Sequence, residues 1–174
     1  MALHQTHDSI KDRIRHNVNR HLSLDKVGSP VSFSADDTVI EKEHHIKDVG
    51  RYADLGLQTP DGDIAFEVKT SCQDFKRYPD QAKDYRLAGY IPVLVGTYEI
   101  FDEISDSDKL PEVYYVLATR RQMVFIDEYP DLLGPLAQSH HWRCLSRDEV
   151  NREDHDDFDL QLLSLPTGVD FYPV

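Results

Sequence analysis

The chain has 174 residues, of which 40% are hydrophobic and 29% are charged, so it is long enough for one sizeable core and short for two. No apolar run approaches the length of a membrane span, and the polar start is unlike a signal peptide, so we expect a cytoplasmic protein without a membrane partner. The net charge of −13 argues against a broad nucleic-acid surface, because binding to phosphates requires cations.

Two interpretations of this acidity stay open. A halophilic protein working in molar salt would need local basic clusters only, because screening there acts within about 3 Å. Alternatively, the protein binds no nucleic acid at all. Composition does not decide between them.

The first predicted element is an amphipathic helix over residues 7–22. Apolar residues recur there every four positions, and Asp8 or Ser9 is a suitable N-cap. The polar face is either a solvated surface or a track for phosphates. Its basic and histidine residues are Arg13, Arg15, His16, Arg20 and His21.

A first strand is predicted within residues 37–48, beginning with Val39 and Ile40. Its Glu43 is a candidate acidic ligand. The neighbouring His44-His45 pair lacks further metal-ligand spacing, so a surface position is the simpler interpretation.

Residues 52–71, YADLGLQTPDGDIAFEVKTS, predict two strands joined by a tight turn. With Asp61 and Gly62 at the centre of the turn, Leu57 pairs with Phe66, and the apolar positions share one face. The register also places Leu55 opposite Val68, Ala53 opposite Thr70, Asp54 opposite Lys69, and Gly56 opposite Glu67.

The opposite face of this hairpin collects three charged residues. Asp54 and Glu67 become diagonal neighbours, about 5–8 Å apart at the backbone, with Lys69 beside them. Two adjacent carboxylates suit a hard cation such as Mg²⁺ or Mn²⁺. The ammonium could orient a water molecule or stabilise charge on a phosphate.

A second helix is predicted from Pro79 to about Tyr90, with Gln81 and Tyr85 one turn apart on one face. This pair either packs simply or lies over the acidic patch. Later predicted elements are a buried strand over 93–98, a loop or short helix over 101–111, strands over 113–119 and 123–126, a short helix over 131–138, a strand or turn at Trp142, and a helix start at 146–149.

Over about residues 5–100 the chain resembles the PD-(D/E)XK nuclease superfamily. The core motif of that family is an Asp on one strand followed by Glu-x-Lys on the next, which here corresponds to Asp54 and Glu67-Val68-Lys69. The Pro that leads the family motif is replaced by Ala53. The helix residues Gln81 and Tyr85 resemble the Gln-x-x-x-Tyr helix of recombination exonuclease domains.

The resemblance implies an α/β fold, with a restriction-endonuclease-like mixed β-sheet flanked by helices. The core would span about residues 5–126, with a C-terminal extension over 127–174 of the same single domain. It also implies a Mg²⁺- or Mn²⁺-dependent nuclease that acts on DNA, and a possible homodimer.

The same resemblance implies roles for individual residues. Asp54 and Glu67 would hold the metal with the Val68 carbonyl, and Lys69 would activate the attacking water. Gln81 and Tyr85 would support the substrate. The family often has a further acidic ligand on its first helix; no Glu occurs in that helix here, which leaves Asp12 or Glu43 as substitutes.

Two other hypotheses remain from the sequence. The chain could keep a nuclease-like fold without catalysis and serve as a binding or assembly module, which the acidic surface favours. It could also be an unrelated acidic protein, in which case Asp54 and Glu67 would not converge in space.

Overall fold

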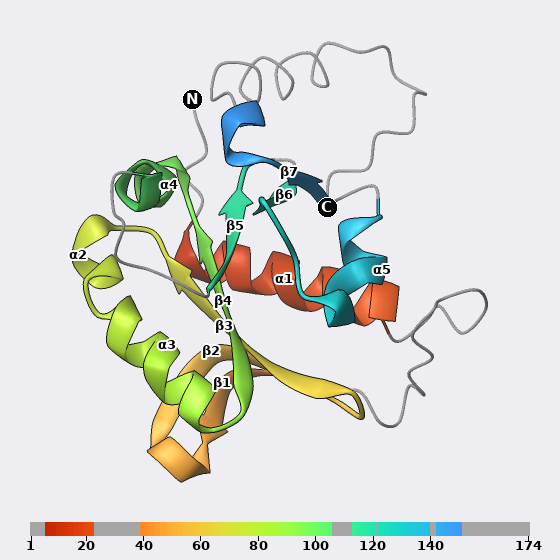
Figure 1. Ribbon diagram of the computed structural model, residues 1–174. Coiled ribbons are helices and arrows are strands. Elements are labelled where there is room, and N and C mark those ends of the chain that lie inside the picture. The colour runs from red at the N-terminus through yellow and green to blue at the C-terminus, as the bar shows by residue number, and fades with distance from the viewer. Residues whose placement is uncertain (1–5, 23–38, 106–112, 121, 140–141, 151–174) are drawn as a thin grey trace.

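The computed structural model of the chain describes residues 6–22, 39–105, 113–120, 122–139 and 142–150. A seven-stranded sheet forms the centre, with strands in the order β1-β2-β3-β4-β5-β6-β7. Helices cover both faces: α1 and α5 lie on one side, and α2, α3 and α4 on the other (Figure 1). The predicted α/β fold, a mixed sheet flanked by helices, is confirmed.

The spatial order of the strands is the same as their order along the chain. β1–β2, β2–β3 and β5–β6 are antiparallel pairs, whereas β3–β4, β4–β5 and β6–β7 are parallel. The strands are β1 (Val39–Ile46), β2 (Arg51–Thr59), β3 (Gly62–Lys69), β4 (Tyr90–Gly96), β5 (Tyr114–Ala118), β6 (Met123–Ile126) and β7 (Trp142–Leu145). The helices are α1 (His7–Leu22), α2 (Cys72–Phe75), α3 (Tyr78–Leu87), α4 (Tyr98–Ser105) and α5 (Gly134–Ala137), with short 3-10 turns at Lys47–Val49, Asp131–Leu133 and Arg147–Glu149.

The main core lies between α1 and the sheet, where the four-residue spacing of α1 buries Ile10, Ile14 and Val18 completely. Thr6 caps this helix instead of Asp8 or Ser9, because its Oγ1 accepts a hydrogen bond from the Ser9 amide at 3.1 Å. Trp142 of β7 belongs to the same core. Residues beyond 126 therefore complete the central sheet.

The hairpin register differs by two residues from the predicted one. Leu57 pairs with Ile64, and Leu55 with Phe66, so the turn is centred on Pro60 and Asp61. The Thr59 hydroxyl closes the turn by donating to the Gly62 carbonyl at 2.7 Å. Because a shift of two preserves side-chain alternation, the acidic positions still approach each other.

Strand alternation is interrupted where β1 and β2 pass the acidic residues. Leu55 belongs to the α1 core, but Ala53 packs in a separate cluster with Ile46 and Tyr85, and not with the other apolar residues of β2 as predicted. On β1, Glu43 has a φ of +51°, which is unusual outside glycine. Asp54 and the next residue, Leu55, both face α1, so the alternation is interrupted between these two positions.

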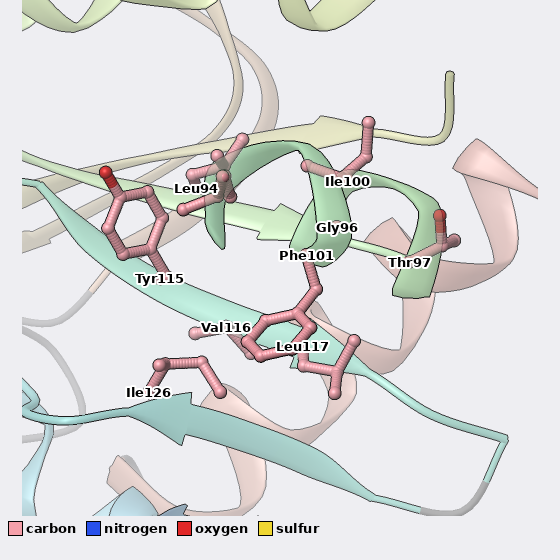
Figure 2. Close-up of a pocket in the computed structure, with 10 residues that line it drawn as sticks. Leu94, Gly96, Thr97, Ile100, Phe101, Tyr115, Val116, Leu117 and Ile126 are labelled. Atoms are coloured by element: carbon pink, nitrogen blue, oxygen red, sulfur yellow. The ribbon is translucent and has the colours of Figure 1, made fainter. Parts of the chain in front are cut away.

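The other sheet face is covered more lightly. Phe101 of α4 reaches toward Leu117 of β5 across a small apolar cavity of about 10 Å³ (Figure 2). Ile100 packs directly on Gly96, where a Cβ would lie 2.7 Å from the Ile100 Cβ. The walls of this cavity are almost entirely apolar, so it is a packing defect that offers a water molecule few polar partners.

Several predicted boundaries are wrong. β4 begins at Tyr90 and contains Pro92, because β5 pairs with this strand only from Val93 onward and leaves the proline without a partner on that side. The 101–111 segment overlaps α4 up to residue 105, and 106–112 lie outside the described residues. No helix in the described part of the chain is long and apolar enough to span a membrane.

Candidate functional site

Asp54 and Glu67 converge where β2 and β3 separate, as the hairpin pattern predicted. The Asp54 amide donates to Glu67 Oε2 at 3.4 Å, and the Val68 amide donates to Asp54 Oδ2 at 2.8 Å. The Glu67 side chain is 6% exposed and that of Asp54 13%. Two carboxylates thus lie together in a largely water-excluded position.

Glu67 is held by residues from its own strand and from α3. Lys69 Nζ donates to Oε1 at 3.1 Å, and Gln81 Nε2 donates to the same oxygen at 3.0 Å. The Tyr85 hydroxyl donates to Oε2 at 2.7 Å. The predicted neighbours Lys69, Gln81 and Tyr85 therefore all contact Glu67 directly.

Asp54 faces α1 instead of α3. His7 Nε2 lies 3.0 Å from Asp54 Oδ2, and Lys11 Nζ lies 3.8 Å from Oδ1. Lys11 also forms an ion pair with Glu43, and its side chain is 4% exposed. A buried ammonium thus bridges Asp54 and Glu43, on the same helix where the family resemblance implied an acidic residue.

The sequence interpretation missed His7 and Lys11. Both lie on the side of α1 that faces the sheet, Lys11 buried and His7 partly exposed, since the spacing 7, 11, 14, 18 continues the stripe that includes Ile14 and Val18. That spacing was the available signal, because a lysine within an apolar stripe needs a buried partner. Only the strand pairing shows that the partner is Asp54.

Asp12 and Glu43, the two predicted substitutes for the acidic ligand of the first helix, differ in their distance from the carboxylate pair. The structure does not bring Asp12 to the pair: its carboxylate forms an ion pair with Lys42 and is 64% exposed. Asp12 follows Lys11 by about 100° around the helix, which turns it away from Asp54. Glu43 lies next to the site, but its contact there is Lys11.

His44 is buried, so the expectation of a surface pair is wrong for this residue. Its Nε2 lies 2.9 Å from the Tyr90 hydroxyl, its Nδ1 lies 3.1 Å from Glu41, and its ring covers Gly56, where a Cβ would lie 2.2 Å from the ring. His45 is exposed and stacks on Tyr52. Within the described part of the chain, neither histidine forms a hydrogen bond or ion pair with Asp54 or Glu67.

Electrostatics in the cluster follow from burial. Burial raises the pKa of Glu67 above its usual value, the charge of Asp54 raises it further, and Lys69 and Tyr85 oppose the rise. The pKa of Tyr85 is raised by burial and by Glu67, so its hydroxyl stays protonated and donates. For Lys11, burial lowers the pKa, but the hydrogen bond to Glu43 and the charge of Asp54 outweigh it and the pKa is raised.

Asp54 and Glu67 are the residues here that could hold a hydrated divalent cation. Mg²⁺ usually keeps several waters and binds through one or two carboxylates, which Asp54 and Glu67 supply. Gln81 Oε1 is buried with no hydrogen-bond donor in the described chain, so it can accept from a metal-bound water. Val68, whose carbonyl was the predicted third ligand, contacts the pair through its amide N–H, which donates to Asp54 Oδ2.

Protein ligands alone do not enclose an ion here. Among the described residues, no three His, Cys, Asp or Glu side chains are grouped so that they could hold a metal. The Lys11 ammonium would compete with a cation for Asp54. Any metal at this site therefore shares the carboxylates with Lys11 and Lys69 and depends on water for its remaining ligands.

No protein-family model matches the chain, and no curated protein matches it. A solved structure of the SPO1766 protein of unknown function from Silicibacter pomeroyi is similar to it, with 18% sequence identity and a TM-score of 0.44. That similarity covers 93% of this chain and 96% of the other.

The contribution of the Tyr85 hydroxyl can be measured by Tyr85→Phe. Since the hydroxyl donates to Glu67, we expect the variant to lose about 1.5–3 kcal/mol of unfolding free energy where Glu67 is ionised. The loss should shrink as the pH falls through the raised pKa of Glu67, because a neutral carboxyl accepts a weaker hydrogen bond. Urea unfolding at several pH values measures both effects.

Tyr78→Phe is the matched control. Tyr78 is fully buried on the same helix, but its hydroxyl has no hydrogen-bond partner among the described residues. Removing that hydroxyl should leave the stability unchanged or raise it. Equal losses in the two variants would contradict the assigned role of Tyr85.

Proposed function

We propose that this chain is a divalent-metal-dependent deoxyribonuclease and that the cluster of Asp54, Glu67 and Lys69 is its active site. The observation that carries the proposal is the convergence of two largely buried carboxylates with a buried lysine. Gln81 and Tyr85 from α3 support the same carboxylate. The resemblance to PD-(D/E)XK nucleases, noted from the motif, assigns these positions the same roles.

A divalent metal held by Asp54 and Glu67 would supply Lewis acidity and would lower the pKa of a water molecule. Lys69, held 3.1 Å from Glu67, positions that water for attack on phosphorus and balances the charge that develops on the phosphate. The P–O bond opposite the water breaks, and the leaving oxygen takes a proton from solvent. Gln81 and Tyr85 fix both oxygens of Glu67, so this ligand does not need to reorganise.

Metal binding gives the first test of this proposal. Calorimetry in high KCl should show Mn²⁺ binding to the parent protein and none to Asp54→Ala, because the variant loses one of two carboxylates. Asp61→Ala, which removes the same charge from the exposed turn, should bind like the parent. Binding that is equal in all three proteins would contradict the site.

The pH dependence sharpens this test. A protonated Glu67 is a poor ligand, and its pKa is raised, so acidification should weaken Mn²⁺ binding at a higher pH than for an ordinary glutamate. Below that pKa the Glu67 carboxyl is neutral and Mn²⁺ binding should weaken; above it, binding should be restored.

The contacts of Lys11 favour a second candidate function. Because Lys11 and Lys69 already balance the two carboxylates, the cluster can be stable without a metal, as expected for a nucleic-acid-binding module that does not cleave. DNA binding without Mn²⁺ binding or cleavage would establish this candidate in place of the nuclease.

A further inference from the structure

A basic groove lies next to the carboxylate cluster, at the junction between α2 and α3. It has a volume of about 410 Å³ and is open to solvent. Its walls are formed by Arg51, Gln73, Lys76, Arg77 and Asp80. With three cationic side chains and one carboxylate, the groove is locally positive, whereas the whole chain has a net charge of −13.

The groove is connected to the cluster through three elements. Arg51 precedes Asp54 by three residues on β2, and α2 begins three residues after Lys69 of β3. Arg77 lies one helical turn before Gln81, whose amide contacts Glu67. A chain crossing Glu67 along the α3 side of the sheet would therefore enter this groove next.

The cations of the groove are available to a ligand. Lys76 and Arg77 are exposed, and neither side chain forms an ion pair or hydrogen bond with the described part of the chain. Arg51 is held by Asp84 through Nε, which fixes the guanidinium and leaves its other N–H groups as donors. By contrast, Lys11, Lys42 and Lys69 are all paired with carboxylates.

We infer that this groove binds the phosphate backbone of the nucleic acid that crosses the site. A fixed guanidinium and two free cations suit successive phosphate oxygens, which Arg binds with a planar set of donors. The Asp80 carboxylate repels phosphate and so limits the affinity of the groove for nucleic acid. The groove therefore favours a nucleic acid that the protein also binds at another place. The inference rests on the proposed function only for the identity of the ligand as a nucleic acid. Binding in the groove does not require that the protein cleaves it.

The test uses the full chain carrying Glu67→Gln, without divalent metal, and a fluorescent oligodeoxynucleotide. Binding is measured by anisotropy over a series of KCl concentrations, with and without Lys76→Gln/Arg77→Gln. Losing two phosphate contacts should weaken binding at low salt by about tenfold or more. It should also reduce the slope of log K against log salt by about 1.4 for single strands and 1.8 for duplexes.

The matched control is Lys47→Gln/Arg143→Gln, which removes one Lys and one Arg charge from exposed positions outside the groove. Its salt slope should equal that of the background protein. Equal slopes for the groove and control variants would overturn the inference, as would equally effective competition by polyglutamate, which has no phosphates. Inorganic phosphate should compete only at millimolar concentrations or above, since it makes one contact.

The experiments distinguish failure of the groove inference from failure of the nuclease proposal. A groove variant with a reduced salt slope in a protein that neither binds Mn²⁺ nor cleaves DNA would support the groove and remove the nuclease proposal. Cleavage that depends on Glu67 in a protein whose groove variant binds DNA normally would do the reverse.

Discussion

Replacing Glu67 by Gln, or Lys69 by Met, should lower the rate of metal-dependent DNA cleavage by about 1,000-fold or more. Glu67 is the better buried of the two carboxylates, and Lys69 is the cation held against it at 3.1 Å. Removing a metal ligand, or the group that balances the developing charge, typically costs about two to three orders of magnitude or more in rate. The measurement is kcat/KM on plasmid and oligonucleotide DNA in Mg²⁺ and Mn²⁺.

Both substitutions preserve shape, so the fold should survive, although each removes one charge of the buried Glu67–Lys69 pair and should lower the stability. Gln at position 67 still accepts from Gln81, and Met has a similar length to Lys. Circular dichroism and thermal unfolding check this, and Glu99→Gln, a change at an exposed position of α4, serves as the activity control. If Glu67→Gln cleaved DNA as fast as the parent, the assignment of the active site would be wrong.

Replacing Lys11 by Met should have the opposite effect on metal binding. Lys11 neutralises Asp54 and Glu43 and competes with a cation for the same oxygens. A unit charge about 4 Å away contributes about 4 kcal/mol at an effective dielectric constant of 20. Allowing for solvent at the exposed Glu43, we expect Mn²⁺ to bind about 10- to 100-fold more tightly to Lys11→Met.

The same variant should be less stable without metal. Removing one partner of a largely buried ion pair costs about 3–5 kcal/mol; we expect about 2–3 kcal/mol here, because Glu43 is 65% exposed. Mn²⁺ should restore the loss, since a ligand that binds only the folded state stabilises it. Lys42→Met, which removes the partner of the distant Asp12, should lose little stability and show no rescue.

An unfolding titration with Mn²⁺ measures both effects in one experiment. A Lys11→Met protein that is destabilised but not rescued by Mn²⁺ would show that the carboxylates do not bind a cation. That outcome would favour the binding module over the nuclease.

Local sequence patterns determined much of this protein. The four-residue spacing of Ile10, Ile14 and Val18 predicts α1, and alternation in 52–71 predicts the hairpin. Glu67 and Lys69 share a face because side-chain alternation within one strand has a period of two. The spacing of Gln81 and Tyr85 similarly places them on one face of α3.

Only tertiary structure decided how these elements meet. The hairpin register differs by two residues from the predicted one, because the Thr59 hydroxyl closes a turn centred on Pro60 and Asp61. Asp54 and Glu67 still approach each other, but through backbone amides, with Asp54 facing α1 and Glu67 held from α3. The contacts of Lys11 with Asp54 and Glu43 join residues 43 and 32 positions apart, and no local pattern encodes such distances.

The sequence by itself therefore determined which side chains share a face within each helix or strand, because backbone periodicity is local. The tertiary structure decided which faces meet, that Lys11 and not Asp12 reaches the carboxylates, and that a basic groove adjoins them. These outcomes depend on the pairing and packing of distant segments, in which burial and charge compensation act on the whole chain at once.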